Sequence, residues 1–326
     1  MSEIRVDPLS GQKTIVAAGR ATRPGAELTA TAAAMIDVSS DPFAEGHEDQ
    51  TPPEVYAVRP HGGRPDGPGW SVRVVPNKYP ALVPGAPDPD RDARPELFRA
   101  GPAAGAHEVI VNSPEPVLHL ADLSAAQVLT AVEVWRQRMR VHAGAACAQL
   151  IVNERREAGA SLPHTHAQLY ALSFVPADVA RERERFGAYA TRTMGQNLLA
   201  DLVQEEVRRR ERVVAIDEEA VLIAPYASRV PFQLMLVPRV PRARFEDDGA
   251  SGAALLHQAL RGLARALGAS PPLNLWIRTA PLGAEQFCWR IDIAPRLTHL
   301  AGLELSTGVN VNIVAPEAAA ARLRDA

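Results

Sequence analysis

The chain has 326 residues, a hydrophobic content of 46% and a formal net charge of −3 at pH 7. This charge leaves no basic excess to neutralise a nucleic-acid backbone, and no apolar run is long enough for a membrane span, so neither kind of partner is expected. Residues 1–20 lack the charged-then-apolar pattern of a signal peptide, which favours a cytoplasmic protein.

The first half of the chain predicts short strands and one helix. Ser124 begins the helix, Gln127 follows it in a capping-box arrangement, and Gly144 lies just past its end. The helix has one apolar face, which includes Trp135. Strands are expected at Ser71–Val75, His107–Val111, Gln149–Val152 and His164–Ala171.

The second half repeats this order around a second amphipathic helix, Ala253–Leu267. Its strands are expected at Val221–Ala224, Phe232–Val237, Leu273–Ile277 and Trp289–Ile293. We interpret the chain as two copies of one α+β unit, residues 1–175 and 176–326. The second begins with a charged helical segment, Pro176–Arg212, suited to an exposed connector or lid. One irregular α+β domain without duplication stays open as the alternative.

The stretch Asn153–Gln168 carries the chemistry. On a strand, His164, His166 and Gln168 fall on one face, and two imidazoles with an amide are costly to bury without partners. Upstream, Gly159 and Ser161 belong to a small-residue loop whose N–H groups and hydroxyl can approach a phosphate.

A neutral imidazole can attack phosphorus and form a phosphoramidate that a second acceptor breaks. In that reaction Gln168 and Ser161 would hydrogen-bond the non-bridging oxygens. A metal site or satisfied core histidines explains His164 and His166 about as well on spacing alone.

These residues resemble the galactose-1-phosphate uridylyltransferase family, a branch of the histidine-triad superfamily in which a Gly-x-Ser loop precedes His-Pro-His-x-Gln. The resemblance extends nearly from end to end, through Asp7–Gln12, Val74–Leu82, His107–Val111 and Ala301–Glu304. It implies two histidine-triad-like units, each an antiparallel sheet with a packed helix, and a homodimer.

The resemblance also assigns roles. His166 would be the nucleophile, with His164, Gln168 and Ser161 completing the catalytic set. Arg20 and Arg23 would reach the nucleotide phosphates, and Glu304 would contact a hexose hydroxyl, acting on the partner subunit's site. The remaining implied substrate contacts are Phe43, Asn77 and Lys78 near the base, and Asn153 and Gly159 near the phosphates.

The family's metal ligands are largely replaced here. Asp41 and Ala44 stand at the positions of a zinc-binding Cys pair, Pro116 at that of a third ligand, and His164 alone cannot hold zinc. No metal is expected, and Asp41 could hydrogen-bond where a thiolate coordinates in relatives.

In the second unit, where relatives carry a further metal site, the corresponding residues are Arg278, Cys288, Arg290 and Asp292. These predict ion pairs rather than a second metal. No cofactor is therefore expected in either unit.

Two other departures concern the substrate. Thr165 replaces the motif's proline and restores a backbone donor, while Thr298 and Leu303 do not match the sugar contacts of the uridylyltransferases. Three hypotheses follow: transfer of a nucleoside monophosphate between a nucleotide sugar and a sugar 1-phosphate through a covalent His166 intermediate, a nucleotide-sugar or dinucleoside-polyphosphate phosphorylase, and a catalytically degenerate nucleotide-binding protein.

Overall fold

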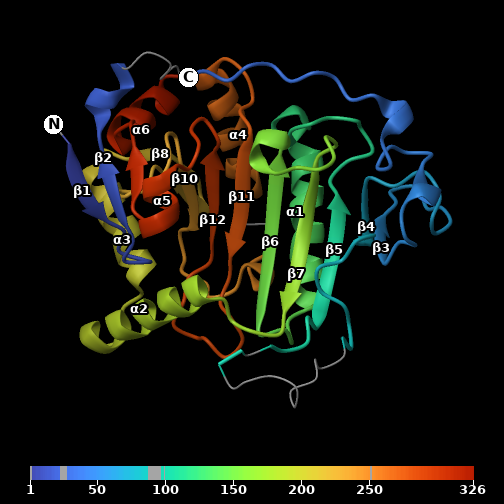
Figure 1. The fold of residues 1–326 in the computed structure, drawn as a ribbon, viewed down its shortest axis with the longest axis horizontal. Helices are drawn as coiled ribbons and strands as arrows, with labels where there is room; N and C mark the ends of the chain where they lie inside the picture. Colours follow the sequence, from blue (N-terminus) through green and yellow to red (C-terminus); the bar gives the residue numbers. More distant parts are fainter. Residues whose placement is uncertain (1, 23–27, 87–96, 99, 250–251) are drawn as a thin grey trace.

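The computed structural model describes residues 2–22, 28–86, 97–98, 100–249 and 252–326, and a ten-stranded antiparallel sheet forms its centre (Figure 1). The first half of the chain supplies β3 (Tyr56–Val58), β4 (Val72–Pro76), β5 (Gly105–Val111), β6 (Cys147–Glu154) and β7 (His166–Leu172). The second half supplies β8 (Val213–Ile216), β9 (Ala220–Ile223), β10 (Leu234–Pro238), β11 (Leu273–Arg278) and β12 (Arg290–Pro295).

Both halves have the same topology. The sheet order is β3-β4-β5-β7-β6 in the first half and, read from the other edge, β8-β9-β10-β12-β11 in the second. Helix α1 (Ala125–Val141) and helix α4 (Ala253–Leu267) stand at equivalent places, each before its half's last two strands. The predicted α+β fold is confirmed, with the antiparallel strands and packed helix of each half joined into one continuous sheet.

The two halves of the sheet are joined by the pairing of β6 with β11, which sets Asn153 opposite Asn274 and Ile151 opposite Trp276. One apolar cluster continues across this junction on the face that α1 and α4 cover, and it includes Trp135 and Leu263. The halves therefore share a single core. The expected boundary at residue 175 falls in the short link between β7 and the next helix.

Helix α1 begins where the sequence predicts, because Ser124 Oγ accepts a hydrogen bond from the Gln127 N–H at 3.1 Å. The side chain of Gln127 does not complete a capping box. It donates instead to the carbonyls of Ser71 and Asn112, each at 2.7 Å, and so ties the helix to β4 and to the end of β5.

The segment predicted as an exposed connector folds into helices α2 (Ala177–Thr193) and α3 (Leu198–Arg209). It is not an open lid. Phe186 and Leu199 are buried against Ile223 and Met235 on the sheet face opposite α4, where they form a second apolar core. The amphipathic pattern of both helices explains this, since only their charged faces meet water.

A second, three-stranded sheet combines the two ends of the chain: β1 (Glu3–Val6), β2 (Lys13–Val16) and β13 (Asn310–Asn312), with β13 parallel to β2. Figure 1 shows it with α5 (Gly302–Thr307) and α6 (Pro316–Arg324) beside the β8–β12 half. No helix in the described ranges is long and apolar enough to cross a membrane.

Candidate active site

His166 is the first residue of β7, and alternation along the strand determines what its side chain meets. Ala167 and Leu169 enter the core under α1, so His166, Gln168 and Tyr170 lie on the opposite face of the sheet. His166 is 6% exposed, and its Nδ1 lies 2.7 Å from the carbonyl oxygen of His164.

That carbonyl can only accept, so Nδ1 of His166 carries the proton and Nε2 keeps its lone pair. Burial lowers the pKa of His166, which favours the neutral ring. The geometry therefore presents Nε2 of a neutral imidazole, the form that acts as a nucleophile.

His164 lies outside the strand, which corrects the expectation that β7 begins there. Its Nδ1 contacts Asp41 Oδ2 at 2.6 Å and its Nε2 contacts the Ser113 carbonyl at 2.8 Å. The Ser113 carbonyl can only accept, so Nε2 carries a proton, while Nδ1 and the Asp41 carboxyl group share the proton between them. Both side chains are fully buried.

The backbone between the two histidines is held by the residue that replaces proline. The Thr165 N–H donates to the Val117 carbonyl at 2.8 Å, and Thr165 Oγ1 accepts from Asn112 Nδ2 at 3.2 Å. Asn112 Oδ1 in turn accepts from Trp135 Nε1 of α1 at 3.0 Å. The backbone N–H that threonine has and proline lacks is thus engaged in a hydrogen bond. These contacts fix the chain between His164 and the start of β7.

Phe43 forms one wall beside the nucleophile. Its ring meets the ring of His166 edge-on, with centroids 5.2 Å apart, and the Phe43 N–H donates to Asp41 Oδ1 at 3.0 Å. Phe43 also packs in a small apolar cluster on this face with Trp70, Val75, Val109 and Val111. Such a surface is suited to the flat face of a nucleotide base.

Gln168 and Asn153, the two predicted phosphate contacts on the sheet, are each held at their carbonyl end. Gln168 Oε1 is 3.1 Å from His107 Nε2 and accepts from the Tyr170 hydroxyl at 3.0 Å. Asn153 Oδ1 accepts from Asn274 Nδ2 at 2.8 Å. The sequence pattern did not single out His107, Tyr170 or Asn274, because their contacts depend on strand register.

The loop before β7 contains Gly159 and Ser161, both exposed. Gly159 has φ 91°, a conformation that a side chain disfavours, and Asn274 Nδ2 holds the loop by donating to the Ala158 carbonyl at 2.7 Å. Of the two other residues predicted near the base, Asn77 has its Nδ2 3.1 Å from His107 Nε2. Lys78 is exposed and donates to the Gln50 carbonyl at 3.4 Å. Contact of these residues with phosphate or base stays a prediction.

The structure does not bring every predicted residue to His166 within one chain. Arg20 lies in a short 3₁₀ helix after β2, and Glu304 lies on α5, both beside the β8–β12 half (Figure 1). Glu304 Oε2 accepts from the Ala301 N–H at 3.0 Å and so caps its own helix. Arg23 lies outside the described residues.

At the corresponding place in the second half, Arg290 is the first residue of β12 as His166 is of β7. Arg290 contacts Asp292 at 2.9 Å and Glu182 of α2 at 3.0 Å, while Arg278 Nε lies 3.5 Å from Glu182. Although burial disfavours its charge, the field of Arg290 and Arg278 lowers the pKa of Glu182. These ion pairs match the sequence interpretation.

Neither the residues around His164 nor those around Arg290 provide the donors of a zinc site. Ala44 has no ligand atom, Pro116 has none, and the guanidinium groups of Arg278 and Arg290 are cations. Within the described ranges, no group of three or more His, Cys, Asp or Glu side chains is arranged to hold a metal ion.

Comparison of the sequence with known protein families gives two matches. The model of the N-terminal domain of galactose-1-phosphate uridyl transferase matches residues 1–176, and a family described only as a domain of unknown function, DUF4921, matches residues 125–326. The chain belongs to the galactose-1-phosphate uridylyltransferase family. It is a nucleotidyltransferase enzyme of that family.

Within this family, a probable galactose-1-phosphate uridylyltransferase of Drosophila melanogaster is 31% identical over 248 residues, covering 74% of this chain and 67% of the relative. An ADP-glucose phosphorylase of Arabidopsis thaliana is 28% identical over 336 residues, covering 99% and 92%. The crystal structure of an ADP-glucose phosphorylase from Arabidopsis thaliana with bound ADP-glucose superposes with a TM-score of 0.81 at 27% identity, covering 100% and 99% of the two chains.

Proposed function

We propose that this enzyme moves a nucleoside monophosphate from a nucleotide sugar to a phosphate-bearing acceptor through a covalent nucleotide on His166. The single observation that carries this is the contact of His166 Nδ1 with the His164 carbonyl, which directs the lone pair of Nε2 away from the protein's own hydrogen bonds.

The reaction has two displacements at one phosphorus atom. His166 Nε2 attacks the α-phosphorus of the nucleotide sugar, an N–P bond forms, and the P–O bond to the sugar phosphate breaks. The departing sugar 1-phosphate takes both bonding electrons. An oxygen of the second acceptor then attacks the same phosphorus and the N–P bond breaks, which returns His166 to its neutral form.

Around this step, Gln168 and Asn153 would donate to the non-bridging oxygens through their amide N–H groups, since their carbonyl ends are already engaged. Phe43 and its apolar cluster would receive the base. The Asp41–His164 ion pair would hold the loop that zinc holds in relatives, so we propose that no metal takes part in the reaction.

The acceptor can be a sugar 1-phosphate, as for the uridylyltransferases, or inorganic phosphate. Phosphate is favoured by the likeness to an ADP-glucose phosphorylase, which covers nearly the whole of both chains. Thr298 and Leu303 also lack the sugar contacts of the uridylyltransferases. We infer that a second copy of the chain brings Arg20 and Glu304 to the site, because within one chain they lie beside the opposite half of the sheet.

The test is intact-protein mass spectrometry after brief mixing with UDP-sugars and, separately, with ADP-sugars. A mass increase of one nucleoside monophosphate, absent in His166→Ala, would establish the covalent intermediate and identify the base. Adding inorganic phosphate or a sugar 1-phosphate to the isolated adduct then identifies the acceptor by which one removes the label. Nucleotide binding without an adduct for any donor would refute the mechanism.

A further inference from the structure

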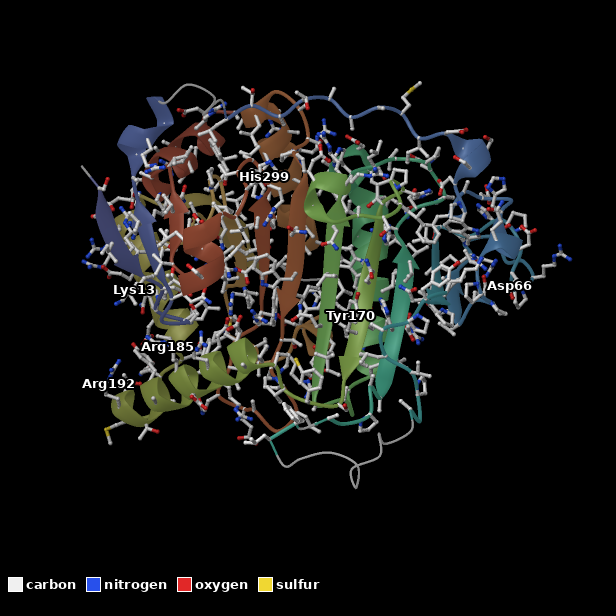
Figure 2. All side chains as sticks on the ribbon, in the orientation of Figure 1. Lys13, Asp66, Tyr170, Arg185, Arg192 and His299 are labelled. Atoms are coloured by element: carbon white, nitrogen blue, oxygen red, sulfur yellow. The ribbon has the colours of Figure 1, made fainter. Side chains whose placement is uncertain are left out.

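The side chain of Gln168 is oriented by two residues from the same face of the sheet. In the register of β5 with β7, His107 stands opposite Tyr170, Val109 opposite Gln168 and Val111 opposite His166. The rings of His107 and Tyr170 stack with centroids 4.0 Å apart (Tyr170 is labelled over β7 in Figure 2). Both therefore lie on the side of Gln168 that faces away from His166.

A backbone group fixes the tautomer of His107. The Ala81 N–H lies 3.2 Å from His107 Nδ1 and can only donate, so Nδ1 holds a lone pair and the proton of the neutral ring is on Nε2. Burial lowers the pKa of His107, which keeps the ring neutral.

Two groups lie 3.1 Å from that Nε2: the Gln168 Oε1 atom and the Asn77 Nδ2 atom. Only the first can accept. The oxygen of Asn77 is used elsewhere, because it accepts from the Tyr79 N–H at 2.8 Å. The proton on His107 Nε2 is thus directed to Gln168 Oε1.

The orientation of the Gln168 carboxamide follows from these contacts. Its oxygen meets two donors, the His107 N–H and the Tyr170 hydroxyl, whereas the reversed amide would set one N–H against another. Its amino end is the end that these two donors leave unengaged, and it makes no hydrogen bond within the described part of the chain.

We propose that His107 is a positioning residue for nucleotidyl transfer, which aims the amide N–H groups of Gln168 at the phosphoryl oxygens on His166. The inference rests on the proposed covalent mechanism and deepens it. A backbone amide thereby determines a side-chain orientation two hydrogen bonds away, with Ala81 acting through His107 on Gln168. Tyr170 supports the same orientation from the neighbouring position.

A double-mutant cycle tests this proposal. The variants are His107→Phe, Gln168→Ala and the double variant, and the readout is the single-turnover rate of nucleotide addition to His166. Phenylalanine keeps a ring for stacking on Tyr170 but has no N–H. A freely rotating Gln168 loses part of the effect of one oriented donor, so His107→Phe should slow the addition about tenfold.

If His107 acts through Gln168, adding His107→Phe to Gln168→Ala should change the rate no further. If the double variant instead lost the product of the two single-variant rate losses, the proposal would be overturned and His107 would have only a structural role. His257→Phe on α4 is the matched control and should leave the rate unchanged. If His107→Phe does not fold, His107→Leu takes its place in the cycle, with the same two outcomes. A wild-type protein that forms no adduct refutes the proposed function and this inference together, whereas an adduct with multiplying losses refutes only the inference.

Discussion

The carboxylate of Asp41 lies 2.6 Å from Nδ1 of His164, and both side chains are fully buried. The same carboxylate caps the turn that carries Phe43, and the carbonyl of His164 holds the ring of His166. One buried pair therefore connects Phe43, the expected base contact, with His166, although the two segments are far apart in the sequence.

Removing Asp41 should destabilise the protein strongly. Asp41→Ala removes one partner of a fully buried pair, which costs about 3–5 kcal/mol of unfolding free energy. Asp41→Asn keeps one acceptor and should cost less, about 1–2 kcal/mol. Urea denaturation measures both, and equal losses would contradict the ion pair.

Chelation should have no effect on the enzyme. If no metal takes part in the reaction, as proposed, dialysis against EDTA should leave the melting temperature and the rate of His166 adduct formation unchanged. Elemental analysis of the purified protein should find substoichiometric zinc and iron. Stoichiometric metal, or inactivation reversed by adding zinc, would show that the ligand assignment is wrong.

Restoring the family's proline at position 165 should weaken the protein. Thr165→Pro removes the N–H that reaches the Val117 carbonyl and the hydroxyl that accepts from Asn112, and it leaves buried groups unpaired. The expected loss is about 1–3 kcal/mol, with slower adduct formation. Thr165→Val keeps the N–H and should lose less, and a proline variant as stable as the wild type would refute this account.

The Arg290–Glu182 pair should show strong coupling. Among the described residues, Glu182→Ala leaves buried Arg290 with Asp292 as its carboxylate partner, and should cost about 3–5 kcal/mol. Because both side chains belong to one network, Glu182→Ala with Arg290→Met should cost clearly less than the sum of the single changes. Additive losses, measured by denaturation, would mean that the contact contributes nothing.

Glu108 should contribute stability that disappears in acid. It accepts from Arg138 at 2.7 and 2.9 Å and contacts His142 at 2.8 Å. Burial opposes its charge, but these partners prevail and lower the pKa of Glu108. Its contribution is therefore complete above the unfolded value of about 4.3 and lost as the pH falls through the folded pKa.

Glu108→Gln should accordingly cost about 2 kcal/mol at pH 7. The difference from wild type should shrink below pH 4, in urea titrations run at each pH. A difference that stays constant down to pH 3 would exclude the ionised carboxylate as its source.

Elements with local signals were predictable from the sequence. The helix α4 has the predicted bounds, Ala253–Leu267, because its apolar periodicity is strong, and Ser124 marks the start of α1 through its own hydroxyl. The strands β1, β2 and β13 had no such signal. Their pairing joins the two ends of the chain, and the pattern within each strand does not encode its partner.

The site divides in the same way. The motif, together with the family resemblance, predicts His166 as the nucleophile and Gln168 and Asn153 as phosphate contacts, and the structure places all three in the same sheet. It could not identify His107 or Asn274, which act only through the register of β5 on β7 and of β11 on β6. His164 was expected on the strand because the sequence does not show that Asp41 and Ser113 draw its ring aside.

The pairing of β6 with β11 has a consequence for any attempt to simplify the enzyme. If the chain were cut after β7, the half that carries His166 would have β6, a strand of eight residues, as an edge of its sheet. The backbone groups of β6 that pair with β11 would then have no partner. Such an open edge recruits strands from other molecules, so the truncated protein should self-associate rather than act as a minimal catalyst. The second half therefore acts as a permanent cap on the edge of the half that carries His166.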